Sequence, residues 1–273
     1  MKRIRVSADL GLASAVRLLA GAVVLFYVAL LAPLPAGADF HVSATLRVEP
    51  APEWGRQASN LTLAREWWFG RNIMAFTAQD WRYIFDKSRS RILVINLTDA
   101  YYVEAPMTAD ARDLVDPGFL STLGRCRVDG TVAKSSQKMT VLGAECQGTA
   151  VSEWLASDNQ HLFDRDRMIY ACPGVPFDWT MARDLVTWMV SFFNPQMAYF
   201  GGLRSIEGFP LAETVVATRN TQRVSYGTVA SGITEGPPPA GIYELPAGAV
   251  RHEKLTQRDV LAMRQIQYLM YFY

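Results

Sequence analysis

The chain has 273 residues, of which 50% are hydrophobic and 19% are charged, and its formal net charge is +1. This composition excludes an intrinsically disordered or low-complexity protein. A near-neutral chain without a run of Lys or Arg also offers no electrostatic basis for binding nucleic acid.

The first 38 residues have the three parts of a bacterial secretory signal peptide. Basic residues at 2–5 precede an uncharged apolar stretch at 18–34, and the small residues Ala36-Gly37-Ala38 follow it. We predict cleavage after Ala38, which would leave residues 39–273 as a single periplasmic domain. The alternative is an inner-membrane anchor formed by residues 18–34, a stretch of borderline length for a spanning helix of about 20 residues.

Alternating polar and apolar residues predict a series of β-strands directly after the leader. Residues 40–48 alternate strictly, which gives this strand one apolar and one polar face. The breaks between the next segments are so short that neighbouring strands must be antiparallel. These strands are predicted at 63–69, 73–78, 81–85, 92–97 and 101–104.

The second half of the chain mixes further strands with helices. Residues 178–193 predict the main helix, whose apolar arc is wider than a surface helix needs. Thr256 and Asp259 form a capping-box pattern that predicts a C-terminal helical tail over about 256–273. A short helix is predicted at 108–115, and strands at 126–133, 140–153, 167–172, 211–218, 222–233 and 242–245, with a turn at 135–138.

Six sequence motifs in this order resemble a known family. They are the segments at 80–86 (DWRYIFD), 91–96 (RILVIN), 101–104 (YYVE), 141–146 (VLGAEC), 208–211 (GFPL) and 242–248 (IYELPAG). Together they resemble periplasmic domains of unknown function in the LolA-like (outer-membrane lipoprotein carrier) superfamily, over about residues 39–255. The resemblance implies a mainly β (α+β) fold, in which a strongly curved antiparallel sheet forms an unclosed half-barrel. It also implies helices across the concave face and a cavity that in the carriers holds acyl chains.

Three cysteines leave the disulfide pattern open. Export makes a disulfide plausible, and only one pair can form from Cys126, Cys146 and Cys172. Cys126 and Cys146 would face each other on strands paired about residue 136, as would Cys146 and Cys172 on strands paired about residue 159. The alternative is three buried thiols.

The sequence contains no recognised catalytic or metal-binding motif. His41, His161 and His252 do not share a metal-ligand spacing, and we expect them to be solvated or hydrogen-bonded. The carboxylates of the 164–166 segment and of Asp110 and Asp113 fall in turn-like or helix-start contexts, where Asp is expected for capping. We therefore expect no enzyme activity, no metal and no cofactor.

Aromatic residues are the most informative set for function. The candidates for a ligand-binding cavity between the sheet and the main helix are Trp67, Trp81, Tyr83, Phe85, Trp188 and Phe192. The alternative is that they form an ordinary filled core. Trp67 and Trp68 are adjacent on one strand, so they must point to opposite faces of the sheet.

These observations predict a non-enzymatic protein that binds or carries a hydrophobic ligand, such as a lipid, an acyl chain or an acylated protein. The alternative is an envelope protein-interaction or sensor module with a filled core, whose partner binds the apolar tail at 268–273. A third hypothesis is a hydrolase with a site that the known motifs do not reveal.

Overall fold

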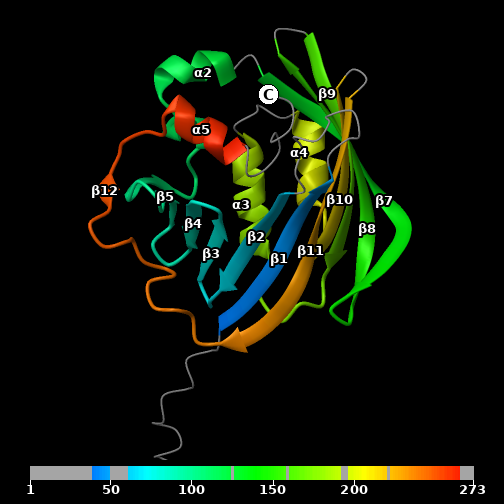
Figure 1. Cartoon of the computed structure of the whole chain (residues 1–273), viewed down its shortest axis with the longest axis horizontal. Coiled ribbons are helices and arrows are strands. Elements are labelled where there is room, and N and C mark those ends of the chain that lie inside the picture. The colour runs from blue at the N-terminus through cyan, green and yellow to red at the C-terminus, as the bar shows by residue number, and fades with distance from the viewer. Residues whose placement is uncertain are drawn as a thin grey trace, which may run out of the picture. The chain divides into compact units, whose positions relative to one another are not determined.

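The computed structural model describes residues 39–49, 61–123, 126–157, 160–191, 196–219 and 222–264. Most of these residues belong to one twelve-stranded sheet, shown in Figure 1. The predicted leader, its apolar stretch, Phe192 and the predicted partner-binding tail at 268–273 lie outside the described residues.

The sheet has the strand order β12-β6-β5-β4-β3-β2-β1-β11-β10-β9-β8-β7. All neighbours pair antiparallel except the short parallel pair of β12 and β6. Its two edges are different strands, so the sheet is unclosed, and the fold is mostly β with few helices, as predicted. The strands are β1 (Asp39–Glu49), β2 (Leu61–Phe69), β3 (Ile73–Ala78), β4 (Trp81–Asp86), β5 (Arg91–Asn96), β6 (Tyr101–Pro106), β7 (Cys126–Val141), β8 (Ala144–Ser157), β9 (Gln160–Cys172), β10 (Phe209–Arg219), β11 (Gln222–Gly236) and β12 (Val250–Arg251).

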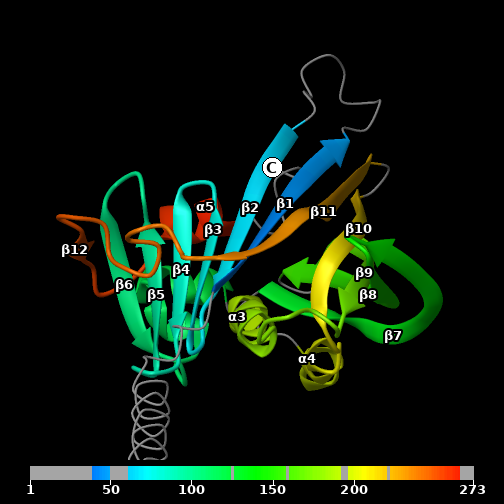
Figure 2. The same cartoon turned by 90° about the horizontal axis from the view of Figure 1, so that it is seen from below.

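The helices are short and lie between strands or after them. They are the 3-10 helix η2 (Ala111–Leu114) and the α-helices α2 (Pro117–Leu123), α3 (Thr180–Val190), α4 (Met197–Arg204) and α5 (Gln257–Arg264). Figure 2 shows α3 between the β3–β6 arm of the sheet and the β8–β10 arm. None of the helices in the described ranges is both long enough and apolar enough to cross a membrane.

The sheet carries an apolar cluster on each of its faces. Directly opposed residues of antiparallel strands share a face, and the strand register places Trp67 with Val42 and Phe76 on the face that packs against α3. We call this the inner face. Trp68 pairs with Ala75 on the outer face, in a smaller cluster that includes Ile242 from the loop after β11. The two adjacent tryptophans therefore point to opposite faces, as predicted.

Three local predictions were wrong. The segment predicted as a turn at 135–138 is a bulge inside β7, and the chain turns instead at Leu142 and Gly143, both with positive φ. The strand predicted at 242–245 is a turn, and β12 (Val250–Arg251) forms the edge of the sheet. The helix predicted at 108–115 is only the single 3-10 turn η2, which Asp110 caps, and a separate helix, α2, begins at Pro117.

The capping box at the start of α5 is confirmed. The carboxylate of Asp259 accepts hydrogen bonds from the backbone N–H and the hydroxyl of Thr256, each at 2.7 Å, and another from the hydroxyl of Tyr101. Asp259 is buried, so its partners lose these bonds without gaining water when it is removed.

We therefore expect Asp259→Ala to lower the free energy of unfolding by about 2 kcal/mol, more than a surface cap would cost. Urea denaturation followed by circular dichroism measures this change. Asp113→Ala, at an exposed position in η2, is the control and should change stability by less than about 0.5 kcal/mol. Equal effects of the two substitutions would contradict the assignment.

Candidate ligand pocket

A pocket of about 170 Å³ lies between α3 and the inner face of the sheet. Side chains from β2, β3, β9, β10 and β11 form its floor, and Ala182, Leu185 and Met189 of α3 form part of its roof. Val186 and Pro210 also line it and are exposed, so the pocket reaches solvent on that side. An enclosed apolar cavity of about 150 Å³ is large enough for a benzene ring.

One end of the pocket is aromatic. The rings of Trp67 and Phe76 stack with their centroids 4.8 Å apart, and Phe209 meets Trp67 edge-on at 5.5 Å. We call these three residues the aromatic end. Its position depends on Gly208, whose φ is 102° and where a Cβ atom would collide with the backbone of Cys172. Only glycine fits this close approach of two chain segments.

The other end of the pocket is polar. Arg65 Nη1 donates a hydrogen bond to Thr228 Oγ1 at 3.2 Å, and Arg167 Nε donates one to Glu213 Oε1 at 2.5 Å. Burial raises the pKa of the Tyr226 hydroxyl, which therefore stays protonated at neutral pH. We call these five residues the arginine end.

The strand register separates the two ends along the sheet. Thr228 pairs with Glu213, and Tyr226 pairs with Val215, which in turn pairs with Arg167. On β10, Phe209 of the aromatic end lies four residues before Glu213 of the arginine end, a span of roughly 13 Å at about 3.3 Å per residue. On β2, Trp67 and Arg65 are two residues apart. The pocket therefore changes from apolar to charged along the strand direction.

The buried carboxylate of Glu153 lies next to the arginine end, on the side away from the pocket. Glu153 accepts hydrogen bonds from Arg165 Nε and from the Tyr199 hydroxyl of α4, and it lies 3.5 Å from Arg167 Nη1. Burial alone raises the pKa of Glu153, but the charges of the two arginines and these hydrogen bonds outweigh it and hold the pKa below its usual value. Glu153 is thus ionised, and through Tyr199 it fixes α4 against the sheet.

A second, wider hollow lies on the other side of α3. Its volume is about 700 Å³, and it is lined by Phe85, Trp188 and Phe200 together with several charged side chains. Trp188 donates a hydrogen bond from its indole N–H to the carbonyl of Ala109 at 3.1 Å, which ties α3 to the loop after β6.

The predicted site residues fall in three places. Trp67 lines the pocket, whereas Phe85 and Trp188 line the second hollow. Trp81 and Tyr83 are buried in the core, where Trp81 packs edge-on against the ring of Tyr101 and Tyr83 stacks on Phe76.

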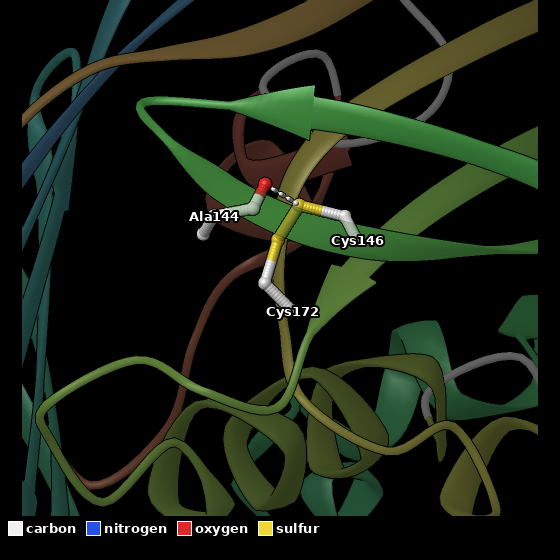
Figure 3. The surroundings of a disulfide bond; sticks show 3 residues. All are labelled: Ala144, Cys146 and Cys172. Carbon is white, nitrogen blue, oxygen red and sulfur yellow. Dashed lines mark hydrogen bonds between the residues drawn. A yellow bond between two sulfur atoms is a disulfide. The ribbon is translucent and has the colours of Figure 1, made fainter.

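The disulfide joins Cys146 of β8 to Cys172 of β9, as Figure 3 shows. This is the pairing predicted for strands related about residue 159, and both cysteines are fully buried. The alternative pairing with Cys126 is wrong, because the β7–β8 hairpin turns at Leu142 and Gly143. This turn places Cys126 opposite Ser157 and Met139 opposite Cys146. Cys172 also pairs with Phe209, so the disulfide supports the aromatic end of the pocket.

The three histidines contact aromatic or acidic neighbours. His41 stacks on Trp68 and lies 3.9 Å from Glu66, His161 lies 3.0 Å from Asp164, and His252 stacks on Tyr101. Within the ranges that the structure describes, no group of His, Cys, Asp and Glu side chains has the arrangement of a metal site.

Sequence reasoning missed the buried charged residues that lie next to the arginine end of the pocket. Asp164 and Asp166, predicted in a turn, are exposed on strand β9, and Arg165 between them points to the inner face and is buried. A signal was present in β8, where Glu153 interrupts an apolar row between Val151 and Leu155. A carboxylate on the buried face of a strand requires a cationic partner nearby.

Comparison with known proteins finds similarity among solved structures only. No protein-family model matches the chain, and no curated protein matches it. Among solved structures, the chain is similar to a domain described as an outer membrane lipoprotein-sorting protein domain from Vibrio parahaemolyticus. The match has 6% sequence identity and a TM-score of 0.27, and it covers 75% of this chain and 88% of that domain. It is a domain of the kind that the sequence motifs resemble, and at this TM-score we draw no functional conclusion from it.

Proposed function

We propose that this chain is a non-enzymatic protein of the cell envelope that binds or carries a hydrophobic ligand in the pocket between α3 and the inner face. In this proposal the leader is cleaved after Ala38, the domain works in the periplasm, and α3 and α4 cover the concave side of a half-barrel. The ligand is a lipid, an acyl chain or an acylated protein, and no cofactor takes part.

The observation that carries the proposal is the pocket itself. Its aromatic end and the α3 side chains Leu185 and Met189 present an apolar surface around space that no side chain of the described chain fills. Burial of apolar ligand surface there would contribute about 25 cal/mol per Å² removed from water, or about 0.8 kcal/mol per buried CH₂ group. A binding site of this kind is largely preformed, so little ordering opposes binding.

Filling the pocket tests the proposal. Ala182 is buried in α3 and lines the pocket, and we expect Ala182→Leu to weaken binding of the neutral fluorescent probe N-phenyl-1-naphthylamine at least about tenfold. The added methyl groups occupy ligand space without disturbing the helix, because Leu is a good helix former. The thermal midpoint of the variant should stay equal to or above that of the native chain.

The matched control places the same substitution outside the pocket. Ala198 is exposed in α4, and Ala198→Leu should leave probe affinity unchanged. Equal affinities of the native chain, Ala182→Leu and Ala198→Leu would show that the probe binds elsewhere, and the pocket would then have no binding role.

The second candidate function is an envelope protein-interaction or sensor module with a filled core. In this hypothesis the partner binds the apolar tail at 268–273, which lies outside the described residues. Deletion of residues 266–273 separates the two functions. If deletion abolishes capture of an envelope partner while Ala182→Leu leaves it unchanged, the interaction module is the better description.

A further inference from the structure

We propose that the second hollow is a separate binding site for a small organic anion with a flat apolar body, such as an aromatic carboxylate or sulfonate. The anionic group would bind at Arg204 of α4, and the ring would pack against the aromatic residues of the hollow. This inference goes beyond the proposed function, because it concerns a different space from the pocket.

Different faces of α3 line the two spaces. Ala182, Leu185 and Met189 line the pocket, at a spacing that places them on one face of the helix. Asp184 and Trp188, one turn apart, line the second hollow on another face. A ligand can therefore occupy one space without filling the other. The volume of the hollow, about 700 Å³, lies within the range of roughly 300–1,000 Å³ that is usual for ligand pockets.

The walls of the second hollow are held in place by hydrogen bonds. Trp188 donates from its indole N–H to the carbonyl of Ala109, which fixes the loop after β6 against α3. Tyr199 donates to the buried carboxylate of Glu153, which fixes α4 against the sheet. The site is thus largely preformed, so little ordering opposes binding.

Arg204 lines the second hollow from the last turn of α4. Its guanidinium lies over the ring of Phe200, 5.0 Å from the ring centroid. This cation–π contact positions the charge without supplying an acceptor. In the part of the chain that the structure describes, Arg204 has neither an ion pair nor a side-chain hydrogen bond. Its five N–H donors therefore remain for the oxygens of an anion, which the forked guanidinium matches well.

The carboxylates that line the second hollow already have arginine partners. Asp110 accepts hydrogen bonds from Nε and Nη2 of Arg112, the shorter of them at 2.7 Å. Asp184 lies 3.6 Å from Nε of Arg183. Among the described lining residues, Arg204 is thus the cation that no carboxylate neutralises.

Arg183 adds a second donor to the lining. Its Nε is buried and has no hydrogen-bond partner within the described ranges, because a separation of 3.6 Å from Asp184 is too long for a hydrogen bond. A buried donor without an acceptor is unfavourable, so an acceptor atom from a ligand would be stabilising there.

The aromatic residues define the other part of the ligand. Phe85, Trp188 and Phe200 belong to β4, α3 and α4, and they meet at this one hollow. Aromatic side chains prefer stacked or edge-on contacts with another ring. A ligand that joins a ring to one acidic group therefore matches both the aromatic residues and Arg204.

Two probes with the same rings separate the two sites. N-phenyl-1-naphthylamine is neutral, and 8-anilinonaphthalene-1-sulfonate is the same ring system with an added sulfonate. Isothermal titration calorimetry should show that the sulfonate binds to the Ala182→Leu chain, in which the pocket is filled. Adding Arg204→Met to that chain should weaken binding of the sulfonate at least about tenfold, because Met keeps the apolar stem but lacks the charge.

The matched control is Arg47→Met, a substitution of the same kind at an exposed position of β1 on the outer face. In the Ala182→Leu chain it should leave the affinity for the sulfonate unchanged. Arg204→Met alone should leave the affinity for N-phenyl-1-naphthylamine and the thermal midpoint unchanged, since Arg204 is exposed and does not line the pocket.

Two outcomes would overturn the inference. In the first, the sulfonate binds equally well to the Ala182→Leu chain with and without Arg204→Met. In the second, it does not bind to the Ala182→Leu chain at all. Neither outcome bears on the proposed function, which the neutral probe tests separately at the pocket.

Discussion

Replacing Glu153 by Gln is expected to lower the free energy of unfolding by about 3–5 kcal/mol, because it leaves buried positive charge without its counter-ion. The native carboxylate accepts bonds from Arg165 and Tyr199 and lies near Arg167. Gln has the same shape as Glu, but it lacks the negative charge and has only one acceptor oxygen in place of the two carboxylate oxygens. Urea denaturation at pH 7, followed by tryptophan fluorescence, measures the loss.

The control is Glu145→Gln on the same strand. Glu145 forms a 2.7 Å ion pair with Lys138 in which both side chains are mostly exposed, so its loss should cost less than about 1 kcal/mol. If Glu153→Gln and Glu145→Gln destabilise the chain equally, the buried cluster does not contribute as the structure indicates.

The pH dependence of stability gives a second readout for Glu153. Its pKa in the folded chain lies below its usual value of about 4.3, so the stability it contributes is fully present above that value. It is lost as pH falls through the lower pKa of the folded state. The acid limb of the stability curve should therefore be shallower in Glu153→Gln than in the native chain.

Removal of the disulfide is the second large effect. Replacing both Cys146 and Cys172 by Ala should lower the free energy of unfolding by about 3.5 kcal/mol, because the bond closes a loop with a sequence separation of 26 and restricts the unfolded chain. Guanidinium denaturation of the native and variant chains under oxidising conditions measures the difference. Binding of N-phenyl-1-naphthylamine should also weaken, since Cys172 pairs with Phe209 at the aromatic end.

Reductant and the third cysteine provide the controls. Dithiothreitol should lower the stability of the native chain to that of the double variant and leave the variant unchanged. Cys126→Ser should respond to dithiothreitol as the native chain does. A Cys126→Ser chain that no longer responds would show that Cys126 takes part in the bond, contrary to the structure.

The strand meander could be predicted from sequence because each strand there is a local pattern. Strict alternation in β1 and the short breaks of two to four residues between β2 and β6 allowed these strands to be predicted within about two residues of their observed ends. The same reasoning failed in β7, where polar residues around Ser135 look like a turn but form a bulge. The observed turn contains Leu142 at a φ of 51°, a conformation that Leu rarely adopts. The sequence therefore does not predict a turn at this position.

Helix α4 and the charged cluster could not be predicted from the sequence, because both depend on contacts between distant segments of the chain. The glycines at 201 and 202 weaken the helical pattern of α4, yet Gly202 is required because a Cβ atom there would come within 2.8 Å of the side chain of Val132. Arg65, Glu153, Arg167 and Glu213 come from four different strands, and only the strand order brings them together. The aromatic residues were visible in the sequence, but whether each lines the pocket or fills the core depends on packing.

Native mass spectrometry of the full chain, purified without detergent, is the most direct test of the hydrophobic pocket. The account predicts a bound species of lipid mass, present on the native chain and on Ala198→Leu but strongly reduced on Ala182→Leu. A single mass without ligand on the native chain, unchanged after incubation with envelope lipids, would contradict it and leave the pocket as an unused gap in the core.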